Sequence, residues 1–445
     1  MSLQNLKRAS RIKGYGYLFT PNMKRCSSQD AAKSAYKFVV VGGGAAGLSV
    51  ASFLSRKFPN QVAVVEPSDK HFYQPLWTLV GGGIKDVSES VRPMKSVMPE
   101  KSDWIQDGAA EFNPESNSVL TLGGKEIKYE FLIVATGLQI NFGKVKGLQE
   151  SLGMPGVCSN YSIKTVTDTF KSIQTFQGGN ALFTLPNTPI KCQGAPQKIM
   201  YLAEDYFRKH GIRSKANVHY MTALSFMFAV PKYRTVLDRI CAERDINVNF
   251  RHNLIELNYG DREAIFEVLD ESGKAVDKKT IQFEMIHVTP PQGPIDAVKQ
   301  SKLVDATGFV DINKHTMRHK TYPNVFSLGD CSNAPISKTA AAISGQSAAV
   351  RQNIMALLEG REPEKEYQGY TSCPLITGYN RCVLAEFNYD GVPMETFPVD
   401  QGKERTSMFY LKSDVMPAIY WDGLIKGYWN GPGFYRKLMH LGLVE

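Results

Sequence analysis

The sequence lacks the features that define several classes of protein. Its seven cysteines form no CxxC pair and no regular spacing, which excludes a disulfide-rich secreted scaffold and the usual zinc sites. No run approaches the roughly 18 consecutive apolar residues of a membrane-spanning helix. The eight histidines form no ligand cluster and no CxxCH motif occurs, so we predict neither a metal site nor attached haem. The remaining composition, 43% hydrophobic and 21% charged residues, is typical of a globular protein with more than one domain.

The net charge of +9 is concentrated at the N-terminus. Residues 1–35 hold seven basic side chains and one acidic side chain, so they carry +6 and the rest of the chain carries +3. A basic segment with several serines and no apolar core is typical of a mitochondrial transit peptide and not of a secretory signal. A disordered basic tail is the alternative. No nucleic-acid-binding motif accompanies the charge, so nucleic acid is not an expected partner.

A glycine-rich turn follows the first strand-like run. Residues 36–41 are apolar and β-branched, and Gly42-Gly43-Gly44-Ala45-Ala46-Gly47 then opens a helical stretch that reaches Phe58. In this motif the first glycine permits a tight turn, the middle one lets a pyrophosphate approach, and the last allows close helix–strand contact. A second strand at 62–65 ends at Glu66, the expected acid for ribose hydroxyls. The segment therefore predicts a dinucleotide-binding site.

Two later segments favour FAD over NAD as the dinucleotide. Residues 131–134 form an apolar strand that closes on Ala135-Thr136-Gly137, and residues 322–328 form another that ends in Gly329-Asp330. Both resemble the secondary FAD motifs of flavoproteins with two dinucleotide-binding domains. That resemblance implies that the Asp330 carboxylate binds the flavin ribityl chain.

The middle of the chain predicts a second αβ unit without a nucleotide motif. The expected elements are a strand at 181–185, a helix at 197–210, a strand at 218–224 and a helix at 233–244. In pyridine-nucleotide reductases with this layout, the first turn carries a second glycine motif for NAD(P)H. Here the turn at 186–196 has three prolines and one glycine, and proline offers no N–H to a phosphate. Cys192 stands in this turn instead.

The chain resembles the mitochondrial type of sulfide:quinone oxidoreductase from about residue 36 to the C-terminus. The resemblance lies in residues 39–47, 71–77, 190–198, 329–342 and 373–381 and in the aromatic tail. It implies an α/β fold with two Rossmann-like domains of the glutathione-reductase type, bound FAD, and a C-terminal amphipathic segment that binds a membrane.

The resemblance also implies the chemistry. Cys192 and Cys373 would face the flavin and carry an oxidised sulfur bridge that hydrogen sulfide attacks as HS⁻. Cys373 would become a persulfide, and Cys192 would leave as a thiolate that can add to the flavin ring. Two electrons would pass through FAD to ubiquinone, and the sulfur would pass to sulfite, glutathione or cyanide. The sequence itself shows neither that the two cysteines approach each other nor which one carries the persulfide.

The candidate site residues follow from the motifs and the resemblance together. Lys191 adjoins Cys192 and is a candidate for stabilising its thiolate, with a solvated surface lysine as the alternative. Lys338 is a candidate for stabilising negative charge on a reduced flavin. The candidate catalytic residues are Cys192 and Cys373, and the candidate cofactor-binding residues are Gly42, Gly43, Gly44, Ala45, Ala46, Gly47, Glu66, Gln74, Ala135, Thr136, Gly137, Gly329, Asp330, Lys338 and Thr339.

The C-terminal tail predicts a membrane-surface segment. Eight of the 38 residues from 408 to 445 are aromatic. One apolar helical face holds Met416, Ile419, Tyr420, Leu424 and Tyr428, and a second stripe holds Phe434, Leu438 and Leu441 beside Arg436, Lys437 and His440. Such helices lie in a membrane interface, and helices packed on the protein or in a dimer are the alternative. Removing residues 408–445 is therefore expected to leave flavin bound and to abolish membrane sedimentation.

The predicted organisation places a transit peptide at 1–35, FAD-binding parts at 36–155 and 291–360, the second Rossmann-like domain at 156–290, and a redox-cysteine and membrane-attachment region at 361–445. The expected location is the matrix side of the mitochondrial inner membrane, peripherally bound, and a homo-oligomer is compatible with the sequence. Two other functions stay open. A type II NADH:quinone dehydrogenase would need glycines at 186–194, and a non-catalytic flavin-binding sensor or scaffold would not need the two cysteines.

Overall fold

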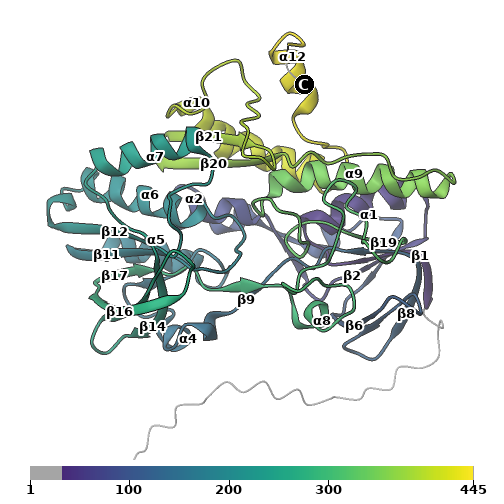
Figure 1. The fold of residues 1–445 in the computed structure, drawn as a ribbon, viewed down its shortest axis with the longest axis horizontal. Coiled ribbons are helices and arrows are strands. Elements are labelled where there is room, and N and C mark those ends of the chain that lie inside the picture. Colours follow the sequence, from purple (N-terminus) through teal and green to yellow (C-terminus); the bar gives the residue numbers. More distant parts are fainter. Residues whose placement is uncertain (1–32, 444–445) are drawn as a thin grey trace, which may run out of the picture. The chain divides into compact units, whose positions relative to one another are not determined.

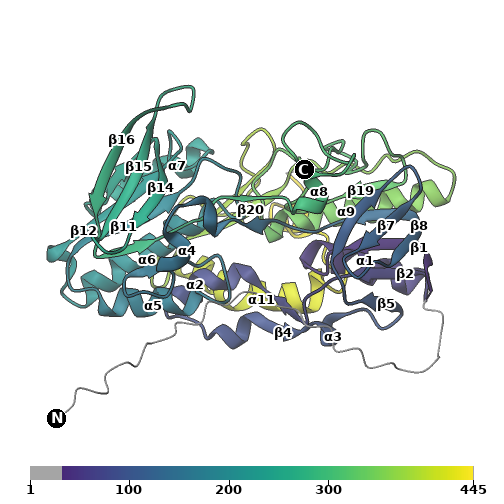
Figure 2. The same cartoon turned by 90° about the horizontal axis from the view of Figure 1, so that it is seen from below.

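The computed structural model describes residues 33–443, so all but the last three residues of the predicted transit peptide lie outside the described part of the chain. Within it, two sheets lie side by side, with a β-hairpin and the C-terminal helices across them (Figure 1, Figure 2). The predicted α/β class with two Rossmann-like units is confirmed. The domain boundaries stay predictions.

The first sheet carries the glycine-rich motif. Its strand order is β5 (Ser102–Ile105), β2 (Val62–Val65), β1 (Ala35–Val41), β8 (Glu126–Val134), β7 (Ser118–Thr121) and β6 (Ala109–Asn113), and β19 (Val325–Ser327) also pairs with β8. The central strands β2, β1, β8 and β19 run parallel. Their valine and isoleucine side chains are buried on both faces, as helix-covered parallel strands require. The helices α1 (Ala45–Lys57) and α9 (Ala340–Leu358) contact each other beside this sheet.

The second sheet is wholly parallel. Its order is β10 (Val157–Cys158), β17 (Met285–His287), β11 (Gly179–Leu185), β12 (Ala216–Thr222) and β13 (Asn247–Asn249). The helices α5 (Val166–Thr175), α6 (Ala195–Lys209) and α7 (Pro231–Glu243) belong to this unit, and β14 (His252–Asn258), β15 (Glu263–Leu269) and β16 (Ala275–Gln282) form an antiparallel sheet beside it. The predicted elements exist, although α6, β12 and α7 each begin two residues earlier than expected.

A hairpin joins the two units. Its strands are β20 (Thr371–Gly378) and β21 (Arg381–Phe387), and β20 contacts both α6 and α9. Every residue of β20 is buried, so its side chains pack on both faces. The hairpin therefore brings Cys373 to the boundary between the two units.

The C-terminal tail is helical, and the second predicted helix forms, but the first half is not one regular amphipathic helix. It begins with α10 (Thr406–Tyr410), continues through π-helical turns at Leu411–Val415 and Ile419–Leu424 around the short α11 (Met416–Ala418), and ends in α12 (Gly433–Met439). Tyr420 and Leu424 of the first apolar face are only 4% exposed and pack against the protein, whereas Tyr428 of the same face is 63% exposed. The Ser52 hydroxyl donates to the Ile425 carbonyl at 2.7 Å, which fixes this half of the tail on α1.

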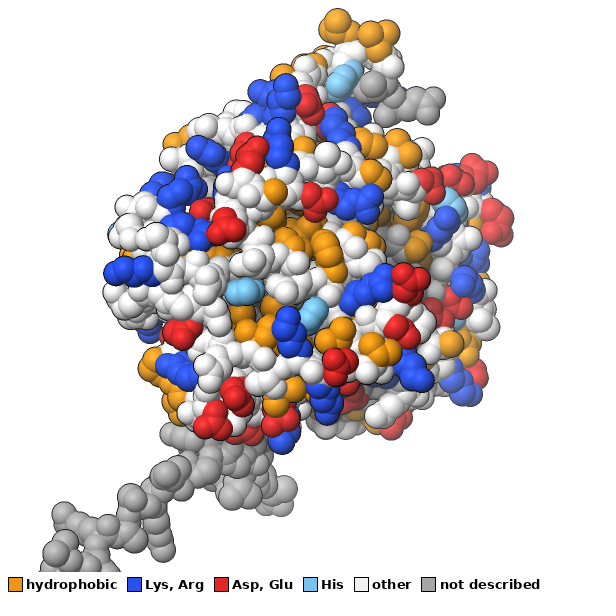
Figure 3. Space-filling model, turned by 60° about the vertical axis from the view of Figure 1, so that its left-hand side comes forward, with side chains coloured by type: hydrophobic (Ala, Val, Ile, Leu, Met, Phe, Trp, Pro, Cys, Tyr) orange, Lys and Arg blue, Asp and Glu red, His pale blue; other side chains and the backbone are white. Residues whose placement is uncertain are grey.

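The second predicted stripe faces outward. Phe434, Leu438 and Leu441 are 73%, 60% and 87% exposed. Figure 3 shows hydrophobic side chains at the tip of this segment, at the top of the view. In residues 33–443 no helix combines the length and the apolar character needed to cross a bilayer.

Candidate active site

One cavity of about 730 Å³ gathers the predicted cofactor-binding residues. Its volume is typical of a ligand site. All of those residues except Gly47 line it, and Cys192 and the lysines Lys191, Lys198 and Lys412 line it as well. Cys373 is buried directly behind the lining. Segments distant in sequence therefore converge on a single site.

The glycine motif has the geometry that the sequence predicted. Gly42 has φ +109°, a backbone conformation that favours glycine. A Cβ on Gly47 would collide with the carbonyl of Gly42, so this glycine brings α1 against the turn and explains why it does not line the cavity. A Cβ on Gly44 would meet nothing within 4 Å, so the backbone there is open to a ligand. The N-terminus of the 13-residue helix α1 points its free N–H groups at this opening.

Glu66, which follows the second strand, hydrogen-bonds to the glycine turn. Its Oε2 accepts the Gly43 N–H at 2.7 Å, and its Oε1 accepts the Ser68 N–H at 2.8 Å. Burial raises the pKa of Glu66, and these two N–H donors partly offset that rise. The carboxylate is thus fixed at the cavity wall next to the glycine turn, where a ribose would lie.

The opposite wall is formed by Asp330, Lys338 and Thr339. Burial raises the pKa of Asp330, and the charges of Lys338 and Lys191 partly offset this. The Lys338 Nζ donates to the Ser332 carbonyl at 3.0 Å, and burial lowers its pKa. Thr339 caps α9 by accepting the Ala342 N–H at 3.0 Å, so its position is fixed by the helix.

The loop of Cys192 is attached to the first unit. Its N–H donates to the Lys338 carbonyl at 2.9 Å, and its own carbonyl accepts the Ala195 N–H at 2.9 Å and the Tyr161 hydroxyl at 3.3 Å. Cys192 has φ +52°, a left-handed conformation that costs a non-glycine residue about 1–3 kcal/mol. These hydrogen bonds hold it there, at the N-terminus of α6.

The structure brings the two predicted cysteines together. The Cys192 and Cys373 side chains lie close enough for each to change the pKa of the other, and both are free of disulfides. Gly194 makes the approach possible, because a Cβ at this position would stand 2.7 Å from the Cys373 Sγ. The N-terminus of α6 at Gly194 thus lies directly against the Cys373 sulfur on β20.

The two thiols differ strongly in acidity. The interaction with Cys373 and the charges of Lys198 and Lys412 hold the pKa of Cys192 well below its usual range, against the effect of burial. The same interaction and burial raise the pKa of Cys373. An N-terminal helix position also favours a thiolate. Cys192 is therefore the more acidic thiol of the pair and the one favoured as a thiolate.

Two lysines that sequence reasoning missed supply this charge. Lys198 is 3% exposed and its Nζ donates to the Cys192 Sγ at 3.4 Å. Lys412 is 2% exposed and its Nζ donates to the Pro75 carbonyl at 2.7 Å; burial and the charge of Lys198 lower its pKa to about 7. Lys198 could have been found from its place in the first turn of the helix after Cys192. Nothing near Cys192 in the sequence signals Lys412.

Lys191, the lysine that the sequence favoured for this role, points elsewhere. Its Nζ donates to the Gln74 Oε1 at 2.6 Å and to the Tyr161 carbonyl at 3.5 Å, and it lies 5.3 Å from the centre of the Trp77 ring. Burial lowers its pKa to about 8. It therefore links the Cys192 loop to Gln74 and does not contact the sulfur.

His71 and Tyr420 connect the glycine turn to the C-terminal tail. The His71 ring bonds to the Gly43 carbonyl at 2.9 Å through Nδ1 and to the Tyr420 hydroxyl at 2.7 Å through Nε2. Burial lowers the pKa of His71 to about 4, so it is neutral at pH 7. Tyr420 also lies 4.4 Å from Tyr73, centre to centre. The tail is thus part of the cavity wall.

Comparison with known proteins identifies the family. The family described as pyridine nucleotide-disulphide oxidoreductase matches residues 36–175. The mitochondrial sulfide:quinone oxidoreductase of Mus musculus is 52% identical over 413 residues, which are 93% of this chain and 91% of that protein. The protein of the same name from Dictyostelium discoideum is 48% identical, over 90% of this chain and 88% of that protein.

A solved structure agrees at the level of the fold. The sulfide:quinone oxidoreductase of Aquifex aeolicus superposes with a TM-score of 0.76 at 20% identity, covering 93% of this chain and 96% of that one. The two-unit fold and its cavity thus define a flavin-dependent oxidoreductase of the pyridine nucleotide-disulphide class. With relatives this similar along nearly its whole length, the chain belongs to the mitochondrial sulfide:quinone oxidoreductase family.

Proposed function

We propose that this protein oxidises hydrogen sulfide through Cys192 and Cys373, with FAD as its bound cofactor and ubiquinone as the electron acceptor. One observation carries the proposal. The loop that would bind NADH in related reductases instead holds a thiol favoured as a thiolate, beside a second buried thiol and two buried lysines, at the wall of the cofactor cavity. The family membership supports the same activity.

The cavity fits FAD. The open backbone at Gly44, the α1 N-terminus and the fixed Glu66 carboxylate suit the pyrophosphate and ribose. The Thr136 hydroxyl is buried at the lining and has no hydrogen-bond partner among the described residues, so it is available to a ligand. When bound, a flavin supplies a two-electron acceptor that can pass its electrons to a quinone.

The chain's own residues perform the sulfur chemistry. In the oxidised protein the two sulfurs form a bridge, and HS⁻ attacks the Sγ of Cys373. The new S–S bond makes Cys373 a persulfide, the old bond breaks, and its electron pair leaves on Cys192 as a thiolate. Lys198 stabilises that thiolate from 3.4 Å, so Cys192 is the better leaving group. This assigns the persulfide to Cys373.

The sulfur acceptor is a small anionic nucleophile. Cys192 lies among the buried cations Lys198 and Lys412, with Lys191 on the same cavity wall. The part of the cavity next to Cys192 is lined by these lysines, and a region of one charge attracts the opposite charge. Sulfite, glutathione and cyanide all meet this requirement. Transfer to any of them breaks the persulfide S–S bond and returns the Cys373 thiolate. The two thiolates would then re-form the bridge by giving two electrons to the bound flavin, which would pass them to the quinone.

The outer end of the tail suits a membrane surface. α12 exposes Phe434 and Leu438, Leu441 follows it, and Pro432 and Tyr435 line the cavity. A hydrophobic quinone could pass from lipid to the cavity at this point. The proposed location is peripheral, on the matrix side of the mitochondrial inner membrane; the names of the relatives support a mitochondrial location.

The function is tested by following the flavin spectrum under nitrogen. Sulfide is expected to bleach the flavin absorbance within the dead time or the first seconds of mixing, and added ubiquinone to restore it. NADH is expected to leave the spectrum unchanged, because the Cys192 loop and the α6 N-terminus offer no open cradle for a pyrophosphate. Rapid bleaching by NADH without bleaching by sulfide would instead establish a type II NADH dehydrogenase.

The membrane role is tested on α12. Replacing Phe434 and Leu438 with glutamate is expected to lower binding to phospholipid vesicles at least about tenfold, since burying each side chain is worth about 1.5–3 kcal/mol. Flavin content should not change. The control Leu122→Glu alters an apolar side chain that is 73% exposed outside the tail and should bind vesicles normally. Unchanged sedimentation of the double variant would refute the membrane role of α12.

The larger truncation has a different expected result from the one that the sequence suggested. Removing residues 408–445 takes away Lys412, Tyr420 and Leu424 from the cavity wall, and with them the bond to His71 under the glycine turn. This truncation is therefore expected to lose flavin as well as membrane binding. We therefore propose α12 and its flanks as the membrane segment, on the exposure of Phe434 and Leu438.

A further inference from the structure

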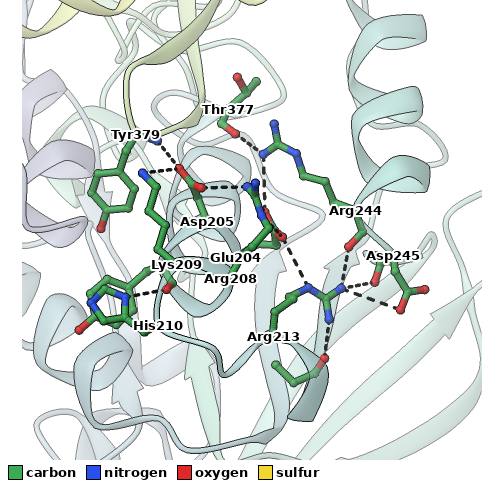
Figure 4. A network of polar contacts seen from close by, with 12 residues as sticks. Glu204, Asp205, Arg208, Lys209, His210, Arg213, Arg244, Asp245, Thr377 and Tyr379 are labelled. Atoms are coloured by element: carbon green, nitrogen blue, oxygen red, sulfur yellow. Dashed lines mark hydrogen bonds and ion pairs between the residues drawn. The ribbon is translucent and has the colours of Figure 1, made fainter.

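The segments that carry the two cysteines are also joined far from the sulfurs. Figure 4 shows a polar network at the C-terminal half of α6, where Glu204 and Asp205 are 1% and 4% exposed. Asp205 reaches out of its own helix. Its Oδ2 accepts the backbone N–H of Tyr379 at 2.7 Å, in the turn between β20 and β21. Its Oδ1 accepts from Arg208 at 2.8 Å, so the buried carboxylate is paired with a cation.

α6 therefore contacts β20 at two separate points. At the first, Gly194 lies against Cys373, where a Cβ would stand 2.7 Å from the sulfur. At the second, Asp205 lies against Gly378, where a Cβ would stand 3.0 Å from Oδ2. The helix and the strand run in the same direction between these points.

The two paths have the same length. The helix from Gly194 to Asp205 rises about 16.5 Å at 1.5 Å per residue. The strand from Cys373 to Gly378 spans about 16.5 Å at roughly 3.3 Å per residue. A slip of one residue would move the strand by about 3.3 Å and turn the Cys373 side chain to the other face. Both contacts can thus be made only in the observed register.

We propose that Asp205 is a positioning residue that fixes the register of β20 and so holds the Cys373 sulfur against Cys192. The inference rests on the proposed function, because the spacing matters only if these two sulfurs form a bridge. A bridge requires the two Cβ atoms about 3.5–4.5 Å apart, so a fraction of the 3.3 Å slip already disfavours it. Asp205 acts through the strand and does not touch the sulfurs.

The hairpin has other attachments that keep it folded without Asp205. Arg244 donates to the Thr377 carbonyl and, at 2.9 Å, to Glu404. The Tyr379 hydroxyl donates to the Gly82 carbonyl at 2.7 Å. These contacts hold the strand near α6, and Asp205 selects its position along the helix.

The test measures the Cys192–Cys373 bridge directly. Flavin-loaded protein is equilibrated in glutathione redox buffers, the free thiols are alkylated, and the oxidised fraction of the pair is read by mass spectrometry. Asp205→Leu is expected to disfavour the oxidised pair at least tenfold, about 30 mV for a two-electron couple. Asp205→Asn keeps an oxygen that accepts the Tyr379 N–H and should restore nearly the whole wild-type equilibrium.

Two further variants make the result decisive. Arg208→Gln removes one of the two cations paired with Asp205, Lys209 being the other at 3.3 Å, but leaves the bond to Tyr379, and it should match the wild type. Gly378→Ala adds a Cβ that would push the strand away from Asp205, and it should shift the equilibrium as Asp205→Leu does. This variant tests the proposal if Asp205→Leu is insoluble. A wild-type equilibrium in both Asp205→Leu and Gly378→Ala, or an equal shift in Arg208→Gln, would overturn the proposal. The measurement needs no sulfide, so a wild-type protein that sulfide does not bleach refutes the proposed function separately.

Discussion

Replacing either Cys192 or Cys373 with serine is expected to slow the reduction of bound flavin by sulfide about 10³-fold or more. The bridge needs both sulfurs, and removing either member of a unit that acts together costs nearly the whole effect. The measurement is anaerobic stopped-flow absorbance of the flavin with sulfide in excess. Both variants should keep their flavin, because neither cysteine belongs to the glycine turn or to the Asp330 wall.

A matched control is available on the same hairpin. Cys382 lies on β21, is fully buried, and is near the same lysines, but its hydrogen bond goes to the Val383 carbonyl at 3.5 Å and not to Cys192. In the Cys382→Ala variant, sulfide is expected to reduce the bound flavin at close to the wild-type rate. Flavin reduction that persists in both serine variants would defeat the cysteine mechanism.

Replacing Lys198 with methionine is expected to raise the pKa of Cys192 by roughly 1–3 units, the usual effect of an opposite charge at this distance. The sign follows from the charge. The ammonium favours the thiolate, so the thiolate of the wild-type protein persists below the ordinary thiol pKa, and without Lys198 it forms only at higher pH. The pH dependence of the rate at which iodoacetamide alkylates Cys192 in the reduced protein reports this pKa.

Lys191→Met serves as the comparison, because Lys191 is adjacent to Cys192 in the chain but binds Gln74. Its pH profile should shift much less than that of Lys198→Met. Lys412→Met should give an intermediate shift, since Lys412 acts on the sulfur through charge alone. Equal shifts in the Lys191 and Lys198 variants would show that neighbouring positive charge, and not the 3.4 Å contact, controls the thiol.

Much of the fold was predictable because its signals are local. The buried β-branched run, the glycines and Glu66 lie within one strand–turn–helix–strand unit, where the backbone needs of the turn dictate residue types. The tail was predicted less well. Its 3.6-residue apolar pattern indicates a buried face equally well whether lipid or protein covers it. Only the tertiary structure assigned Tyr420 to the cavity wall and Phe434 to the surface.

The candidate site, too, was predictable only in part from the sequence. The absence of a second glycine motif singled out the Cys192 loop from the sequence alone, because proline cannot offer N–H groups to a phosphate. The sequence offered Lys191 as a candidate cation for the thiolate, with a surface lysine as the alternative, but sequence adjacency does not give side-chain direction, and Lys191 binds Gln74. Lys198 lies one turn into the helix, and Lys412 comes from more than 200 residues away in sequence.

The sequence by itself therefore determined that the first unit binds a dinucleotide and that the second unit lacks a glycine motif for NAD(P)H. Both conclusions depend on the backbone requirements of short segments. The tertiary structure alone decided that Cys373 meets Cys192, that the buried Lys198 and Lys412 lie beside the pair, and that Phe434 and Leu438 of α12 are exposed. These facts depend on contacts between distant segments, such as Gly194 with Cys373 and Asp205 with Tyr379. Long-range register of this kind is fixed by packing and buried hydrogen bonds, which no local pattern records.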